Sequence, residues 1–258
     1  DAHAALAGSG IAVAGKMLIA MGTSTCHMMV SKEEVFVEGV AGVVKDGVLP
    51  GYYGYESGQS AVGDIFAWVI NYGVPEVYYS ESKELGISLH ELLIRKSIRQ
   101  TVGGHGLIAL DWLNGNRSVL MNSNLNGLLM GLTLNTKPED IYRAMIEATA
   151  FGSKIIINSY ENSGIEIREL YACGGLTCNE FLLQIYSDVT GLDIKVATSP
   201  QTTALGGAIL GAVAAGSKKG GYDSYEEAIG KMTKPIQKSY KPNLKNQKVY
   251  HEMFKNYV

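Results

Sequence analysis

The stretch LYACGGLTCNEFLLQIYSDVTG, residues 170–191, decides the predicted fold. Its apolar start predicts a strand that ends at Cys173, and the apolar spacing after Asn179 predicts a helix. Two glycines, Gly174 and Gly175, stand between the strand and the helix. Because glycine is used where the backbone must approach another group closely, this pair indicates a close neighbour at the end of the strand.

An anion fits such a turn. The first N–H groups of a helix have no acceptor within the helix, and the helix dipole favours negative charge. Glycine would let a phosphate or a ribose lie against the backbone, and Asn179 can cap the helix or reach a polar edge of the ligand. A tight turn with an asparagine cap explains the same residues equally well. The spacing does not match the GxGxxG pattern of dinucleotide-binding folds.

A second loop of the same kind lies near the start of the chain. The runs KMLIAM (16–21) and CHMMV (26–30) predict a β-hairpin. Its tip offers backbone N–H groups and hydroxyls together, which is typical of a phosphate cradle, on Gly22, Thr23, Ser24 and Thr25. A polar turn without a ligand is the alternative. Two such loops in one chain favour a polyphosphate held between them.

The rest of the chain alternates apolar runs with helix-like periodicity. Apolar runs predict strands at 16–21, 26–30, 33–44, 104–110, 128–134, 167–173 and 193–197. Helices are predicted at 58–72, 88–100, 137–162, 179–190 and 202–215, with a loop over 51–60. Capping boxes, Ser88 to Glu91 and Thr136 to Glu139, set two helix starts. Gly191 is expected to end the helix over 179–190, and the small residues Ala148 and Gly152 predict a close neighbour on the inner face of the helix over 137–162. Strands that come first and then alternate with helices predict an α/β layer fold with a mixed sheet.

Composition narrows the class of protein. The 258 residues carry a net charge of -3, so no basic excess points to nucleic acid. No run of about 18 apolar residues predicts a membrane span. The three cysteines form neither a CxxC pair nor a disulfide framework, which favours a reducing compartment, the cytoplasm. The chain begins at Asp1 without a methionine, and we expect it to be part of a longer protein.

Several motifs together resemble the C-terminal half of FGGY-family carbohydrate kinases. They occur in the expected order, as DAHAA (1–5), MGTSTCHMMV (21–30), GVLPGYYGYESGQSAVGDIFAW (47–68), LIALDWLNGNRS (107–118), ACGGLTCNEFLLQIYSDVTG (172–191) and TTALGGAILGAVAAG (202–216). Residues 127–147 resemble a further signature of the family. The segments GYESGQS and DWLNGNRS resemble most closely the members that phosphorylate L-ribulose.

The resemblance implies a ribonuclease-H-like domain of the actin and hexokinase type, with a mixed sheet flanked by helices. It implies a nucleotide-binding domain over 1–216, an extension over 217–258 packed on the same domain, and an N-terminal sugar-binding domain absent from this chain. The implied reaction is ATP- and Mg²⁺-dependent phosphorylation of L-ribulose to L-ribulose 5-phosphate, in arabinose catabolism. We expect residues 1–258 alone to be inactive, and a homodimer is compatible with the resemblance.

The resemblance also implies roles for single residues. It makes Asp1 the catalytic base and Glu56 a sugar contact. It assigns the nucleotide phosphates and adenosine to Gly22, Thr23, Gly174, Gly175 and Asn179. A solvated N-terminal residue is the alternative for Asp1, and charge complementarity at a helix start is the alternative for Glu56.

The sequence suggests roles for two further residues. Arg117 either touches a phosphate or is a solvated charge in a turn. His27 is expected to be a packed, hydrogen-bonded core residue.

Two other functions stay open at this point. The substrate of an FGGY kinase can be xylulose, glycerol or another polyol. An actin- or chaperone-like module, in which ATP drives conformational change, would use the same nucleotide loops. A dinucleotide oxidoreductase is disfavoured because GxGxxG is missing.

Overall fold

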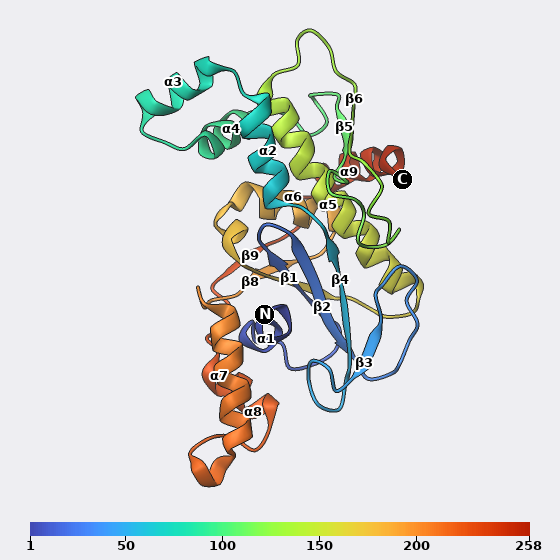
Figure 1. Ribbon diagram of the computed structural model, residues 1–258, viewed down its shortest axis with the longest axis vertical. Coiled ribbons are helices and arrows are strands. Elements are labelled where there is room, and N and C mark those ends of the chain that lie inside the picture. Colours follow the sequence, from blue (N-terminus) through green and yellow to red (C-terminus); the bar gives the residue numbers. More distant parts are fainter.

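The computed structural model describes all residues from 1 to 258, and a seven-stranded mixed sheet forms its centre (Figure 1). The strands lie in the order β3-β4-β2-β1-β7-β8-β9. Their bounds are β1 Lys16–Met21, β2 Thr25–Ser31, β3 Val43–Lys45, β4 Tyr53–Gln59, β7 Glu169–Cys173, β8 Ile194–Val196 and β9 Lys238–Tyr240. A separate two-stranded ribbon pairs β5 (Ile108–Leu110) with β6 (Leu128–Met130).

Strand β1 is the central element of the sheet. It runs antiparallel to β2 and parallel to β7. Met17 and Ile19 face the larger hydrophobic core, and Leu18 faces the smaller core on the other side. Because a strand covered on both faces is apolar at nearly every position, the run KMLIAM reads as a continuous apolar stretch rather than as an alternating one.

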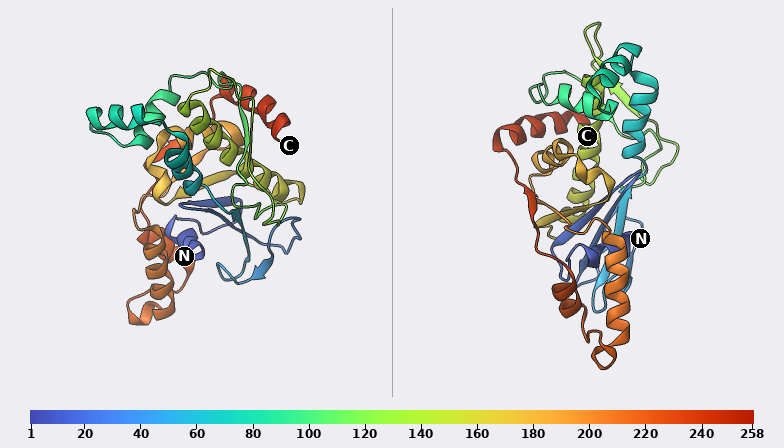
Figure 2. Two further views of the ribbon diagram at one scale, coloured as in Figure 1. Left: turned by 45° about the horizontal axis from the view of Figure 1, so that its top comes forward. Right: turned by 90° about the vertical axis from the view of Figure 1, so that its left-hand side faces the viewer.

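Helices cover both faces of the sheet. The larger core packs against α2 (Gly63–Gly73), α4 (Leu89–Ser97), α5 (Pro138–Asn162), α6 (Glu180–Thr190) and α9 (Leu244–Tyr257). The smaller core packs against α1 (Ala2–Gly8), α7 (Thr202–Ala215) and α8 (Tyr225–Met232). Helix α3 (Glu76–Leu85) packs on the larger core through the partly buried Tyr78 and lies at the end of the molecule opposite α7 and α8 (Figures 1 and 2). No helix combines the length and the apolarity needed to cross a membrane.

Helices α1 and α7 are in backbone contact. A Cβ atom on Gly206 would lie 1.8 Å from the Ala4 carbonyl oxygen, and one on Gly8 would lie 2.0 Å from the Thr202 carbonyl oxygen. Only glycine is compatible with such distances. This packing brings the start of α7 beside α1.

The structure corrects several of the predicted elements. Residues 51–60, expected as a loop, contain the buried strand β4, and the helix expected from 58 begins at Gly63. The glycines of YGYESGQ lower its strand propensity, but pairing with β2 and β3 overrides that preference. Of the strand expected over 33–44, only β3 forms, and α3 was not expected. Thr136 does not cap α5; the Asp140 carboxylate accepts from the Lys137 N–H at 2.8 Å instead.

Other predictions are confirmed. The β1–β2 hairpin, β7, α6 and α7 form within a few residues of their predicted bounds. Ser88 accepts from the Glu91 N–H at 3.1 Å, and Gly191 ends α6 with φ of +78°. The close approach expected on the inner face of α5 occurs at Gly152, where a Cβ atom would lie 2.6 Å from the Gln59 side chain.

The tail from 217 to 258 adds to both the sheet and the core. Strand β9 pairs antiparallel with β8. Tyr250, Phe254 and Tyr257 of α9 are buried in the larger core. The tail therefore packs on the same sheet as the rest of the chain.

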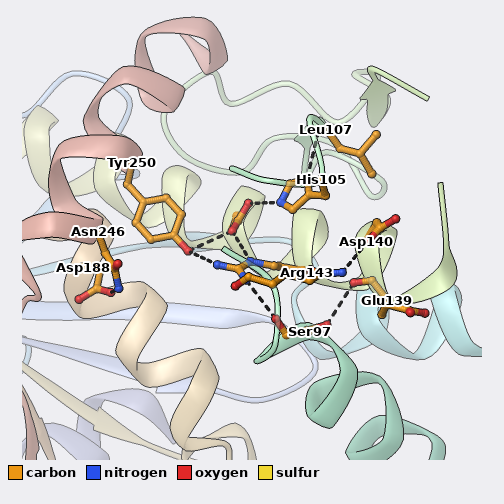
Figure 3. Close-up of polar contacts among 11 residues, drawn as sticks. Ser97, His105, Leu107, Glu139, Asp140, Arg143, Asp188, Asn246 and Tyr250 are labelled. Atoms are coloured by element: carbon orange, nitrogen blue, oxygen red, sulfur yellow. Dashed lines mark hydrogen bonds and ion pairs between the residues drawn. The ribbon is translucent and has the colours of Figure 1, made fainter. Parts of the chain in front are cut away.

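A buried ionic cluster joins α5 to α9 and to the loop before β5 (Figure 3). Arg143 Nε donates to Glu147 at 2.8 Å, and His105 Nε2 lies 2.9 Å from the same carboxylate. Tyr250 donates to Glu147 at 3.0 Å. Arg143 also donates to the main-chain oxygen of Ser97 at the end of α4. Three segments that are distant in sequence are thus tied to one helix by charged groups.

A second buried polar chain runs from β2 to the C-terminal helix. His27 Nε2 lies 3.0 Å from Ser153 Oγ, and Ser153 donates to the Gln59 side chain at 2.9 Å. Gln59 and Tyr257 each donate to the Asp111 carboxylate at 2.7 Å. Since Ser153 donates onward, His27 Nε2 carries the proton, and its buried Nδ1 has no hydrogen-bond partner. His27 is therefore the packed, hydrogen-bonded core residue that was predicted.

His27 should make the stability depend on pH. Burial, and secondarily the charge of Arg117, lower the pKa of His27 to about 3. Between that value and the ordinary pKa near 6.5 the unfolded state binds more protons, so stability falls as the pH falls, by about 1.4 kcal/mol per pH unit. Urea unfolding at pH 7, 6 and 5 should show a smaller loss in His27→Gln than in the wild type. Equal losses in both proteins would contradict the assignment.

Candidate functional site

A pocket of about 400 Å³ opens where β1 and β7 end and β2 begins. Five of the seven residues predicted for the site line it: Asp1, Gly22, Thr23, Gly174 and Gly175. The hairpin tip and the glycine pair, which are about 150 residues apart in sequence, thus share one cavity. They meet because β1 and β7 are parallel neighbours, so that the residues after both strands emerge at the same edge of the sheet.

The hairpin tip presents free donors. The main-chain oxygens of Gly22 and Thr23 accept from the N–H groups of Gly63 and Val62 at the start of α2, at 3.0 and 2.8 Å. The N–H groups and hydroxyls of Thr23 and Ser24 have no partner within the protein. A loop whose carbonyls are tied to one side and whose amides are free is suited to bind an anion.

The two glycines serve different purposes. Gly174 has φ of +99°, and a Cβ atom there would lie 2.3 Å from the Met21 carbonyl oxygen. The close neighbour is therefore the protein's own strand β1, which corrects the expectation that a ligand excludes a side chain at this position. At Gly175 a Cβ atom would meet nothing within 4 Å. Only Gly175 leaves its space open to the pocket.

Alanine substitutions should separate the two glycines. Gly174→Ala combines a strained backbone with a clash and should lower the free energy of unfolding by at least about 1–3 kcal/mol. Gly175→Ala should change it by less than about 0.5 kcal/mol. Urea denaturation of both variants measures the difference. Equal destabilisation would show that the two positions are under the same constraint.

The start of α7 also lines the pocket, a position that was not predicted from the sequence. Pro200, Gln201, Thr202 and Thr203 form this wall. No side chain caps the helix. The first main-chain hydrogen bond of the helix runs from the Leu205 N–H to the Gln201 carbonyl, so the N–H groups before Leu205 at the helix start are unpaired. The N-cap position is held by Gln201, whose side chain makes no capping hydrogen bond.

Asn179 caps α6 and does not line this pocket. Its side-chain oxygen accepts from the Leu182 N–H at 3.1 Å. Of the two roles considered for Asn179, the structure has the cap. Contact with a nucleotide remains a prediction.

Asp1 lies at the mouth of the pocket, at the start of α1. Its Oδ1 accepts from the Ala2 N–H at 2.7 Å, and the residue is exposed. It is the only carboxylate among the residues that line the pocket. A free carboxylate oxygen beside a donor-rich cavity is placed to accept a proton.

Glu56 lies next to this pocket rather than in it. It is on β4, and one of its oxygens forms an ion pair with Arg117. Its other oxygen lies 3.7 Å from His3 Nε2, two residues from Asp1. Cys26, which lines the pocket, has its sulfur 4.0 Å from Glu56 and 3.5 Å from Arg117. Glu56 therefore lies at the rim, joined to the pocket through Cys26.

The protonation states of Arg117 and Cys173, near the site, follow from their surroundings. Burial would lower the pKa of the Arg117 guanidinium, but its contacts with Cys26 and Glu56 raise it overall, so this cation is permanent. Burial raises the pKa of the Cys173 thiol to about 11, which keeps it neutral. No cluster of three or more His, Cys, Asp or Glu side chains is arranged to hold a metal ion.

A family model and curated sequences match this chain. The model of the C-terminal domain of the FGGY family of carbohydrate kinases matches residues 17–215. A ribulokinase of Halalkalibacterium halodurans is 51% identical over the whole chain, which covers 46% of that protein. A ribulokinase of Bacillus licheniformis is 52% identical, again over the whole chain, with 47% of that protein covered. The chain thus spans about half the length of the curated relatives it matches.

Solved structures share the fold. A xylulose kinase from Rhodospirillum rubrum matches with a TM-score of 0.83 at 19% identity, over the whole chain and 49% of that structure. A Plasmodium falciparum glycerol kinase solved with ADP matches with a TM-score of 0.73 at 21% identity, over 99% of the chain and 49% of that structure. The expected actin- and hexokinase-type fold, with its mixed sheet between helices, is confirmed.

Proposed function

This chain belongs to the FGGY family of carbohydrate kinases, and from that premise we propose that it is the nucleotide-binding part of a kinase that converts L-ribulose to L-ribulose 5-phosphate. ATP is the phosphoryl donor in this proposal. The relatives named ribulokinase, at 51% and 52% identity, support the choice of sugar. Their additional length supports a separate sugar-binding domain as the partner of this chain. A kinase of this kind works in the cytoplasm, where ATP is supplied.

The observation that carries the proposal is the composition of the pocket. Three groups of donors converge on it: the hairpin tip, the turn at Gly175 and the start of α7. No lysine, arginine or histidine lines it, so main-chain N–H groups and hydroxyls have to bind the ligand. Such donors suit a chain of phosphates, which needs several of them in a row rather than one cation.

The proposed mechanism starts with Asp1. In the closed enzyme the carboxylate accepts the proton of the attacking sugar hydroxyl as that oxygen bonds to the terminal phosphorus of ATP, and the bond between this phosphorus and the bridging oxygen breaks to release ADP. The hairpin tip, through Thr23 and Ser24, stabilises the charge that collects on the transferred group. The start of α7 and the turn at Gly175 hold the remaining phosphates in place. Glu56, at the rim, accepts hydrogen bonds from other sugar hydroxyls and orients the sugar.

The residues present fit a Mg²⁺ ion that enters with the nucleotide. Mg²⁺ in phosphoryl-transfer sites is held by one or two carboxylates together with substrate phosphates and water. Asp1 is the carboxylate that the pocket offers, and no cage of protein ligands exists. When bound, the ion would neutralise phosphate charge.

The test is a substrate panel on the full-length protein. ADP formation should depend on the sugar, and kcat/KM should be higher for L-ribulose than for D-xylulose or glycerol. A preference for D-xylulose or glycerol would agree with the family assignment but would show that the substrate is not L-ribulose. ADP formation that no sugar increases would overturn the proposal and favour a nucleotide-driven module. Residues 1–258 alone should bind ATP weakly by calorimetry and show no sugar-dependent turnover.

A further inference from the structure

Arg117 lies on the long loop between β5 and β6, and this loop is anchored at the sheet. The Gly58 N–H of β4 donates to Ser118 Oγ at 3.1 Å. Asn116 and Asn122 exchange two main-chain hydrogen bonds of 2.9 Å, which close the loop behind Arg117. The position of the guanidinium is therefore set by the fold rather than by a free turn.

The strand beneath Arg117 leaves room for it. A Cβ atom on Gly58 would lie 3.3 Å from Arg117 Nη1 and 2.2 Å from the Thr25 carbonyl oxygen. Glycine at 58 thus allows both the β2–β4 pairing and the side chain above it. The Arg117 side chain is 38% exposed and the Glu56 side chain 33%, so the pair is partly withdrawn from water.

Two basic side chains lie near the Glu56 carboxylate, one beside each oxygen. Arg117 Nη2 donates to Oε1, and His3 Nε2 lies 3.7 Å from Oε2. His3 belongs to α1, the helix that Asp1 caps, whereas Arg117 comes from a loop more than one hundred residues later. The direction of the carboxylate relative to Asp1 therefore depends on a contact between two distant segments.

We infer that Arg117 is a positioning residue that fixes Glu56 for the sugar and thereby sets which ketose is accepted, an inference that rests on the proposed function. A carboxylate with a free side chain can follow the hydroxyls of many sugars. A carboxylate that is held at one of its oxygens presents the other oxygen in one direction only. A site that requires a hydroxyl in a given direction discriminates strongly against sugars that place it elsewhere.

The inferred role makes the effect of Arg117 conditional on Glu56. In the full-length protein, Arg117→Ala should raise KM for L-ribulose about 10- to 100-fold and reduce the preference for L-ribulose over D-xylulose, while KM for ATP changes less than about threefold. Arg117→Lys should recover only part of the loss, because an ammonium keeps the charge but not the planar fork. In a Glu56→Gln background, removing Arg117 should have almost no further effect on KM for the sugar.

The matched control is Arg95→Ala. Arg95 forms the same kind of ion pair with Glu91 on the exposed surface of α4, away from the pocket, and its loss should leave both KM values unchanged. Circular dichroism and thermal unfolding of each variant check folding.

The outcomes separate this inference from the proposed function. If the wild type phosphorylates no ketose, the proposed function fails whatever Arg117 does. If the wild type is active and Arg117→Ala keeps its KM and sugar preference, the inference alone is overturned. It is also overturned if the loss persists in full in the Glu56→Gln background, or if KM for ATP rises instead, because Arg117 would then act on the phosphates.

Discussion

Asp1→Asn in the full-length protein should lower kcat about 10²- to 10⁴-fold, the usual contribution of a general base. The pocket contains one carboxylate, and an amide cannot accept the proton of a sugar hydroxyl. Binding of the sugar, and of ATP in the absence of Mg²⁺, should be nearly unchanged, because the hydrogen-bond donors of the pocket remain. Steady-state kinetics and calorimetric titration with ATP measure the two effects separately.

The geometry of α1 offers a matched pair of variants for this test. Asparagine caps a helix as well as aspartate does, so Asp1→Asn should keep the hydrogen bond from the Ala2 N–H. Asp1→Ala should lose the same activity and, in addition, about 1 kcal/mol of stability from the missing cap. An Asp1→Asn enzyme within threefold of the wild-type kcat would exclude Asp1 as the base.

Glu147→Gln should lower the free energy of unfolding by about 3–5 kcal/mol, the loss typical of breaking a buried ion pair. The Glu147 side chain is 1% exposed and that of Arg143 3% exposed, so Arg143 would keep a buried charge without a counterion. Arg143 and its neighbours hold together α5, the end of α4 and α9 (Figure 3). Urea denaturation of the variant and the wild type gives the difference.

The exposed pair Glu91–Arg95 is the control, since it has the same helical spacing on α4. Glu91→Gln should change stability by less than about 0.5 kcal/mol, because water screens an exposed pair. Similar losses in the two variants would show that burial does not set the strength of the pair at Glu147.

The buried cluster around Glu147 also makes the stability of the protein depend on pH. Burial would raise the pKa of Glu147, but the hydrogen bonds and charges of His105 and Arg143 outweigh it and hold the pKa below the ordinary value. The carboxylate therefore contributes stability above its unfolded pKa of about 4.3, and the contribution is lost as the pH falls further. Glu147→Gln should flatten the stability curve in that acidic range.

Local sequence was enough to predict those elements whose signals lie within a few residues. The apolar run of β1, the capping serine at Ser88, the glycine at Gly191 and the strand–glycine–helix turn at Gly174 were identified correctly. Each depends on backbone preferences or on burial of one side of a short segment. These features were sufficient for the fold class and for both loops of the pocket.

The pairing of distant segments could not be predicted from signals within a few residues. Strand β4 contains Gly54 and Gly58, and only its neighbours β2 and β3 make it a strand. The uncapped start of α7 became part of the pocket because α1 and α7 touch through glycines. The reason for glycine at Gly174 was the carbonyl of another strand rather than a ligand.

By itself, the sequence determined an α/β domain with two donor-rich loops that follow strands, since periodicity and turn chemistry are properties of neighbouring residues. Only the tertiary structure decided that these loops share a pocket with Asp1 and that Arg117 holds Glu56 at its rim. The physical reason is that strand order and helix packing bring together residues more than one hundred positions apart, and no short segment encodes its partner.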